Sequence, residues 1–346
     1  RANGSLLEKY GLESNNAILA EEKHLPLYAE LAARPDAKYI AGGATQNSIR
    51  VAQWMLQQPG ATAYMGCVGD DDYARRMQDA CVADGVQVLY MVDKTLPTGT
   101  CAVCITGNDR SLVANLSAAN NYKAVHLQEA PNWAVLQSAK VVYSAGFFAT
   151  VSPEAMELAS SEVAKQGGIY CLNLSAPFLM QAPPFKACFD KVMPLVDILF
   201  GNETEAKTWA EVEGWDTQDV GSIATRLSLI PSAKARHRYV VITQGADPTL
   251  VAHKGSVSSY PIIKLPKEKI VDTNGAGDAY VGGFLAALSR GLDIEFCHEA
   301  GAYAASEIIR QSGCTFAGPP NFMLGVPGGT TLRVFNDAFR VASYDG

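Results

Sequence analysis

Residues 272–278, with the sequence Asp-Thr-Asn-Gly-Ala-Gly-Asp, place two carboxylates and two glycines just before a predicted helix. Ile270 and Val271 are expected to end a buried strand. Apolar residues then follow at helical spacing, at positions 281, 284, 285 and 288. The glycines would leave backbone N–H groups uncovered at the positive end of the helix dipole, an arrangement that binds anions. Asp278 would repel an anion there unless it acts as a base, so the pattern indicates phosphate chemistry.

A lone Asp at such a place is more often a helix N-cap, which accepts N–H groups of the first turn. The whole run 272–278, however, resembles the C-terminal signature of the ribokinase-like, or PfkB, family of carbohydrate and nucleoside kinases. The resemblance implies that Asp278 takes a proton from a substrate hydroxyl. It also implies that the amides of Gly275, Ala276 and Gly277 hold charge on the transferring phosphoryl group.

The same family has a second signature near its N-terminus, and residues 41–47 (AGGATQN) match it. Gly42 and Gly43 would allow a sugar ring to approach the backbone, because they carry no side chain. Asn47 can both donate to and accept from a ribose hydroxyl. The alternative is a plain glycine turn followed by an N-cap. Two signatures in the right order make substrate binding the better interpretation.

A third match is the family's Asn-x-x-Glu motif, which this chain has at Asn202 and Glu205. The resemblance implies that Glu205 holds the water shell of Mg²⁺ and that Asn202 lies on the phosphate side. Magnesium suits this role because it keeps several waters and is bound through few carboxylates. The alternative is a pair of solvated acids at a helix start, where the dipole favours them.

Within the family, longer stretches are similar to eukaryotic adenosine kinases, from about Ser5 to Phe316: residues 40–56, 97–120, 145–153, 172–178 and 197–206. This resemblance implies that the 5′-hydroxyl of adenosine attacks the γ-phosphate of ATP, giving AMP and ADP. It also implies that Arg110 helps to neutralise phosphate charge. The expected slot for adenine is apolar: Leu19, Leu112, Ala114, Phe148 and Phe178. By spacing alone, these five apolar residues are ordinary core residues, and Arg110 is a surface residue.

Two segments depart from the adenosine kinase pattern. The resemblance leads us to expect, before residues 6–10, a first strand with an Asn-Pro-Leu-Leu-Asp motif in the middle of the large sheet. Its Asp is expected to hold the ribose hydroxyls, and residues 1–7 contain no Asp to replace it. We therefore expect either an N-terminally shortened sequence or an impaired protein. Residues 318–346 also depart, and we expect them to be extra or unordered.

From about Tyr64 onward, the sequence predicts alternating strands and helices that would hold these residues in place. Short β-branched runs are predicted as strands at residues 140–143, 169–172, 196–200 and 239–242. Such alternation predicts an α/β fold of the ribokinase-like kind, with a mostly parallel central sheet and helices on both faces. Ligands bind beyond the carboxyl ends of such strands. Candidate ATP and phosphate contacts lie at those ends: Asn202, Thr243, Gly245 and Asn274.

A small lid is predicted from segments that break the alternation. Residues 100–106 and 111–116 read as two strands joined by a tight hairpin turn at 107–109. Residues 17–20 and 38–41 also read as strands, around a helix at 21–33. We expect a discontinuous α/β lid, 1–42 with 95–116, which would exclude water from the site. Residues 43–94 and 117–316 then form the large nucleotide-binding domain, and 317–346 an atypical tail.

Composition excludes several classes of protein. The 346 residues are 48% apolar, which supports a sizeable core. A net charge of −7 and the lack of a Lys/Arg run argue against nucleic-acid binding. Uncharged stretches are too interrupted to span a membrane. The eight cysteines lie in apolar contexts, as reduced core thiols do, and Cys101 and Cys104 would point to opposite strand faces.

We therefore expect a cytoplasmic, monomeric kinase for adenosine and ATP with Mg²⁺ as cofactor, and a nuclear pool is compatible with the sequence. The nearest rival is a sibling kinase acting on a sugar or another nucleoside. Arg110 and the apolar set Leu112, Ala114 and Phe148 favour a substrate that carries a base. A rival from another class is a nucleoside-binding protein without turnover. A phosphoryl-transfer assay compared with binding alone separates the three.

Overall fold

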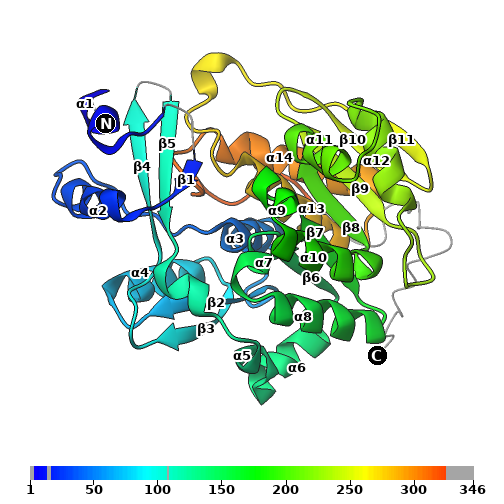
Figure 1. Cartoon of the computed structure of the whole chain (residues 1–346), viewed down its shortest axis with the longest axis horizontal. Coiled ribbons are helices and arrows are strands. Elements are labelled where there is room, and N and C mark those ends of the chain that lie inside the picture. Colours follow the sequence, from blue (N-terminus) through cyan, green and yellow to red (C-terminus); the bar gives the residue numbers. More distant parts are fainter. Residues whose placement is uncertain (1–3, 14–16, 107–108, 325–346) are drawn as a thin grey trace.

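The computed structural model describes residues 4–13, 17–106 and 109–324 (Figure 1). The strands are β1 Ala17–Leu19, β2 Ala63–Gly69, β3 Gln87–Asp93, β4 Thr100–Thr106, β5 Asp109–Asn115, β6 Val141–Ala145, β7 Ile169–Asn173, β8 Ile198–Asn202, β9 Tyr239–Gln244, β10 Asp247–His253 and β11 Ser256–Tyr260. They form three sheets, ordered β1-β5-β4, β2-β3 and β11-β10-β9-β8-β7-β6.

The α-helices are α1 Gly4–Tyr10, α2 Leu25–Ala32, α3 Ala44–Leu56, α4 Asp72–Ala83, α5 Ala124–Gln128, α6 Ala130–Ser138, α7 Phe148–Val151, α8 Pro153–Lys165, α9 Pro177–Gln181, α10 Pro183–Val192, α11 Glu203–Val212, α12 Val220–Leu229, α13 Ala276–Ser289 and α14 Ile294–Ile308. Short 3-10 turns occur at η1 Glu22–His24, η2 Ser117–Asn121, η3 Met193–Leu195 and η4 Lys267–Lys269.

The six-stranded sheet carries the core. Strands β6 to β9 are parallel, as the alternation of strands and helices predicts. Alternate side chains along each strand enter different cores: Leu199 packs with α8, α10, α11 and α12, whereas Ile198 and Phe200 pack with α3, α13 and α14. Helices therefore cover both faces, and the predicted α/β class is confirmed.

Strands β10 and β11 were not predicted. They form an antiparallel hairpin on the β9 edge of the sheet. The turn between them has positive φ at Lys254 and Gly255, 50° and 77°, as a tight two-residue hairpin turn requires.

The small sheet contains the predicted hairpin. Strands β4 and β5 pair antiparallel, and β1 pairs parallel with β5 (Figure 1, left). Its core includes Leu27, Cys104 and Val113. Cys101 is exposed on the opposite face from Cys104, as the strand spacing predicts.

Two local expectations are wrong, and a third is confirmed in part. Residues 38–41 form no strand. The helix expected at 21–33 is present as α2, but it begins at Leu25 after the 3-10 turn η1, with Pro26 at the helix start. Ile270 and Val271 are exposed loop residues. The backbone N–H of Val271 donates to the Ile309 carbonyl at 2.8 Å, so this segment pairs with the end of α14 and not with a strand.

The tail is ordered at its beginning. Trp54 Nε1 donates to the Gly318 carbonyl at 2.6 Å, and the Phe322 ring stacks on Tyr303 with centroids 5.1 Å apart. Residues 318–324 thus pack against α3 and α14, contrary to the expectation of an extra or unordered segment. The expectation for residues 325–346 lies outside the described residues.

Candidate active site

A glycine residue caps the N-terminus of α13. Gly275 is its N-cap with φ 80°, and no side chain caps the helix. A Cβ at Gly275 or Gly277 would meet no atom within 4 Å, so the backbone there faces open space. The first amides of a helix have no intrahelical acceptor. The Ala276 N–H already donates to the Thr273 carbonyl at 3.2 Å. The open backbone at Gly275 and Gly277 is therefore the part of this helix start that a ligand could approach.

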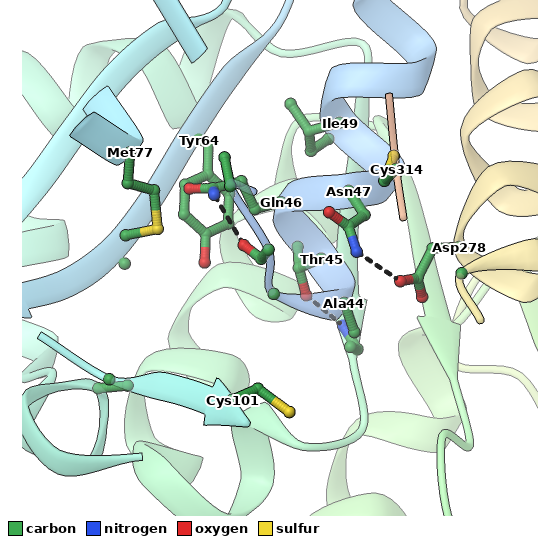
Figure 2. Close-up of a pocket in the computed structure, with 18 of the residues that line it drawn as sticks. Ala44, Thr45, Gln46, Asn47, Ile49, Tyr64, Met77, Cys101, Asp278 and Cys314 are labelled. Carbon is green, nitrogen blue, oxygen red and sulfur yellow. Dashed lines mark hydrogen bonds between the residues drawn. The ribbon is translucent and has the colours of Figure 1, made fainter. Parts of the chain in front are cut away.

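Asp278 lies in the first turn of α13 but does not cap it, since Gly275 holds that position. Its carboxylate instead accepts a hydrogen bond from Asn47: Nδ2 lies 3.0 Å from Oδ2. Figure 2 shows the two side chains pointing toward each other from α3 and α13. The structure thus joins the two signatures, which are 231 residues apart in sequence.

Local backbone geometry positions Asn47. Gly43 is the N-cap of α3 with φ 101°, a conformation that L side chains rarely adopt, and Asn47 N donates to the Gly43 carbonyl at 2.8 Å. Asn47 Oδ1 is buried and has no partner among the described residues. It is therefore an acceptor that a substrate hydroxyl could use.

Close contact between α3 and α13 holds this pair in place. A Cβ at Gly282 would lie 2.5 Å from the Ser48 carbonyl oxygen and 2.6 Å from Val51 Cβ. Only glycine allows the two helices to approach this closely. The Asn47–Asp278 contact therefore depends on a residue one turn further along α13.

Burial raises the pKa of Asp278 to about 7, and the hydrogen bond from Asn47 opposes this shift. An ordinary Asp has a pKa near 4. A general base works best when its pKa lies near the operating pH. The environment of Asp278 therefore suits the proton acceptor that the sequence predicts.

A cavity of about 2350 Å³ adjoins this pair. Eleven of the residues predicted from the sequence line it: Leu19, Gly42, Gly43, Asn47, Leu112, Ala114, Phe148, Phe178, Asn274, Gly275 and Asp278. Asn274 Nδ2 is buried and has no partner in the described part of the chain. The structure thus gathers the expected substrate side chains from the small sheet, α3, α7, α9 and α13.

Phe147 was missed in the sequence. It lines the cavity, is 40% exposed, and its ring lies 6.3 Å from that of Phe178. Its neighbour Phe148 is half-buried and packs against Tyr122. The two adjacent phenylalanines after a strand end were the available signal. Both residues line the cavity, and sequence spacing alone does not show this.

Arg110 lies in β5, opposite Ile105 of β4. Its side chain is outside the described part of the structure. Ala276 and Gly277 are at the start of α13 but are not part of the cavity wall.

A second group of predicted residues lies away from the cavity wall, at the carboxyl ends of β8 and β9: Asn202, Glu205, Thr243 and Gly245. Asn202 and Glu205 form a capping box at the start of α11. The Asn202 Oδ1 accepts from Glu205 N, and the Glu205 carboxylate accepts from Asn202 N, each at 2.9 Å. Asn202 also lies in register with Thr243.

Glu205 is 5% exposed, and burial raises its pKa to about 7. Each carboxylate oxygen accepts one hydrogen bond from Asn202, which leaves lone pairs for water. No cluster of three or more His, Cys, Asp or Glu side chains suited to a metal occurs among the described residues. This donor set fits a hydrated Mg²⁺ carried by nucleotide phosphates, which needs few carboxylates.

Comparison with known proteins identifies the family of this chain. The sequence pattern of the pfkB family carbohydrate kinases matches residues 5–321. The chain belongs to the pfkB family. It is therefore an ATP-dependent kinase of the ribokinase-like fold.

Individual relatives are similar over most of their length. Adenosine kinase 1 of Arabidopsis thaliana is 54% identical over 317 residues, which cover 91% of this chain and 92% of that protein. The crystal structure of Anopheles gambiae adenosine kinase in complex with P1,P4-di(adenosine-5) tetraphosphate has a TM-score of 0.87 and 48% identity, covering 93% of this chain and 94% of that one.

A Schistosoma mansoni adenosine kinase in complex with adenosine and AMP has a TM-score of 0.85 and 32% identity, again covering 93% and 94% of the two chains. Separately, no helix in the described part of this chain has the length and apolar character needed to cross a membrane.

Proposed function

We propose that this pfkB-family chain is an adenosine kinase that transfers the γ-phosphate of ATP to the 5′-hydroxyl of adenosine, giving AMP and ADP. The observation that carries the proposal is the Asn47–Asp278 pair beside the uncovered N-terminus of α13. The relatives that are similar over most of this chain support adenosine as the acceptor.

In the proposed reaction, the 5′-hydroxyl oxygen attacks the γ-phosphorus, and the bond from that phosphorus to the β,γ-bridging oxygen breaks. Asp278 accepts the hydroxyl proton, and ADP leaves with the bridging oxygen. The amides of residues 275–277 hold charge on the transferring phosphoryl group, aided by the α13 dipole. Catalysis by such a site is mostly positioning and charge stabilisation.

Asn47 and the glycines before it hold the acceptor. The free Oδ1 of Asn47 accepts from a ribose hydroxyl while its Nδ2 keeps Asp278 oriented. Open space at Gly42 admits the sugar ring. Adenine then lies in the apolar slot of Leu19, Leu112, Ala114, Phe148 and Phe178, with Phe147 added from the structure.

Magnesium, when bound, neutralises phosphate charge and orients the phosphates of ATP. Glu205 would hold its water shell, with Asn202, Thr243, Gly245 and Asn274 as phosphate-side contacts. Residues 1–42 with 95–116 form the proposed lid, to which Arg110 contributes a cation over the phosphates. The expected state is a cytoplasmic monomer, which gel filtration and cell fractionation check.

The test is a coupled ADP-release assay with adenosine, inosine, guanosine and ribose, with AMP identified by chromatography. Adenosine should be preferred in kcat/KM by at least tenfold. Preference for ribose would favour a sibling sugar kinase. Tight adenosine binding by calorimetry with no ADP release would favour a binding protein without turnover.

A further inference from the structure

Arg50 is a buried cation beside the active site that the proposed reaction does not use. It lies three residues after Asn47, so the two side chains leave α3 on the same side. The residue is 5% exposed, and its Nε donates to Asp84 Oδ2 at 2.6 Å. Replacing a buried ion pair by apolar residues of similar volume is often neutral for stability. The role of Arg50 is therefore sought in its other contacts.

The guanidinium of Arg50 joins two segments of the site. Its Nη1 donates to the Ala41 carbonyl at 3.2 Å and to the Cys314 carbonyl at 3.1 Å. Ala41 belongs to residues 39–43, which lead into α3 and which we call the acceptor loop. Cys314 lines the cavity (Figure 2). Burial raises the pKa of the Cys314 thiol, with Arg50 opposing this shift and Asp278 adding to it, so both charges lie near this residue.

The turn at Gly313 touches both halves of the site. Residues 272–275, which we call the phosphate loop, contain Asp272, and its Oδ2 accepts from Gly313 N at 3.1 Å. On the other side, a Cβ at Gly313 would lie 3.0 Å from Ile40 Cδ1 in the acceptor loop. The guanidinium holds the carbonyl of the residue after Gly313, and so keeps this turn against both loops.

Each loop is also held by a bond of its own. Gln46 Nε2 donates to the Gly42 carbonyl at 2.7 Å in the acceptor loop. Asn274 N donates to Asp272 Oδ1 at 3.0 Å in the phosphate loop. Neither bond involves Arg50. The shape of each loop therefore depends on local contacts, whereas the distance between the loops depends on the guanidinium and the turn that it holds.

We propose that Arg50 is a positioning residue of the kinase reaction, which fixes the distance between the acceptor loop and the phosphate loop. The inference rests on the proposed function. Gly282 sets the spacing of α3 and α13, and Arg50 sets the spacing of the loops that precede these helices. Reacting atoms must approach to about 3–3.5 Å, and a misplacement of about 1 Å can cost roughly 100-fold in rate. A change in loop spacing should therefore reduce kcat more than substrate affinity.

The first test is Arg50→Lys, which keeps a positive charge opposite Asp84 but lacks the planar fork that reaches both carbonyls. In an ADP-release assay, kcat for adenosine should fall at least tenfold. The Kd of adenosine alone and that of a non-hydrolysable ATP analogue alone, measured by calorimetry, should each change by less than threefold. Amide hydrogen exchange at Gly313 should become at least tenfold faster, while exchange at Asn274 should not change.

Asp84→Asn is the matched control. Its amide oxygen can still accept from Arg50 Nε, so the guanidinium keeps its direction while the ion pair is lost. This variant should lower the melting temperature and leave kcat within threefold of the parent. A merely structural role for Arg50 would instead make kcat fall with the melting temperature in both variants alike.

A second variant changes the same spacing from the opposite side and decides the matter should Arg50→Lys fail to fold. Gly313→Ala would place its Cβ against Ile40 and should lower kcat severalfold with each Kd unchanged. Gly291→Ala is its control, because the two glycines have similar φ, 67° and 73°, and a Cβ at Gly291 meets no atom within 4 Å. Both variants carry similar backbone strain, so an equal kcat in the two would count against the proposal.

Two further outcomes would overturn the proposal: an unchanged kcat in Arg50→Lys at saturating substrates, or a loss confined to adenosine affinity. Failure of the proposed function would be recognised separately. A parent chain that prefers ribose would refute adenosine as the acceptor, and kcat for ribose would then test Arg50. A parent chain without turnover would refute both the proposed function and a role for Arg50 in catalysis, whatever the exchange at Gly313 shows.

Discussion

Asn47 Nδ2 donates to Asp278 Oδ2 at 3.0 Å, which links the first turns of α3 and α13. Burial raises the pKa of Asp278 to about 7, and this hydrogen bond is the contact that lowers it. The contact with Asn47 therefore influences both the orientation of the Asp278 carboxylate, the proposed proton acceptor, and its pKa.

Asp278→Asn should reduce turnover about 10²- to 10⁴-fold, the usual contribution of a positioned base. Adenosine affinity should change by less than a few fold, because the amide has nearly the same shape. Stability should not fall, since Gly275 caps α13 and the neutral amide avoids the cost of a buried charge. Turnover is measured by ADP release, affinity by calorimetry and stability by thermal melting. Near-parent turnover would rule out Asp278 as the base.

The pH dependence of kcat/KM for adenosine should show an ascending limb with an apparent pKa of about 7, because Asp278 must be ionised to accept a proton. Asn47→Ala should move this limb to higher pH, since it removes the hydrogen bond that favours the carboxylate. Ser48→Ala, on the next residue of α3, is the matched control and should leave the limb in place. A merely structural role for Asn47 would lower the melting temperature and leave the limb unchanged.

Folding stability should show the opposite trend with pH. The folded chain holds a proton on Asp278 up to about pH 7, whereas the unfolded chain releases it near pH 4. This contribution is therefore fully present at low pH and is lost as the pH rises through about 7. Glu205 also has a raised pKa, but both the parent and Asp278→Asn contain it. The difference between their melting temperatures, measured across pH, therefore gives the contribution of Asp278 alone.

Glu205→Gln should raise the magnesium concentration needed for half-maximal activity severalfold, because an amide holds a hydrated divalent ion less well than a carboxylate. Glutamine also completes a capping box with Asn202, so the melting temperature should stay within a few degrees of the parent. A magnesium titration that superimposes on the parent's would leave Glu205 with a capping role alone.

Gly282→Ala should lower both stability and kcat, because its Cβ would lie 2.5 Å from the Ser48 carbonyl and force α3 and α13 apart. Overpacking of this kind typically costs about 1–3 kcal/mol. Gly221→Ala in α12 is the matched control: the nearest atoms to its Cβ would be at 3.4 and 3.9 Å, so alanine should be neutral or stabilising. Denaturant unfolding and ADP release are measured on both variants. Equal behaviour of the two would show that helix spacing does not position Asn47.

The α/β class and parallel strands β6 to β9 were predictable, because β-branched runs alternate with helical segments and local sequence determines that pattern. The β10–β11 hairpin was not, since its exposed strand Ser256–Tyr260 lacks an apolar pattern. Ile270 and Val271 look like a strand by composition. They are a loop because the Ile270 N–H donates to the Lys267 carbonyl and the Val271 N–H donates to the Ile309 carbonyl at the end of α14.

The residues that could do the chemistry were evident from the sequence alone: Gly275, Gly277 and Asp278 at the start of one helix, and Asn47, after Gly42 and Gly43, at the start of another. Their local motifs specify two helix starts, because glycine permits the positive φ that each N-cap adopts. Tertiary packing was needed to show that these helix starts meet, that Phe147 faces the cavity, and that Glu205 is buried as part of a capping box. Those outcomes depend on contacts between distant segments, such as the close approach at Gly282, and local sequence does not encode such distances.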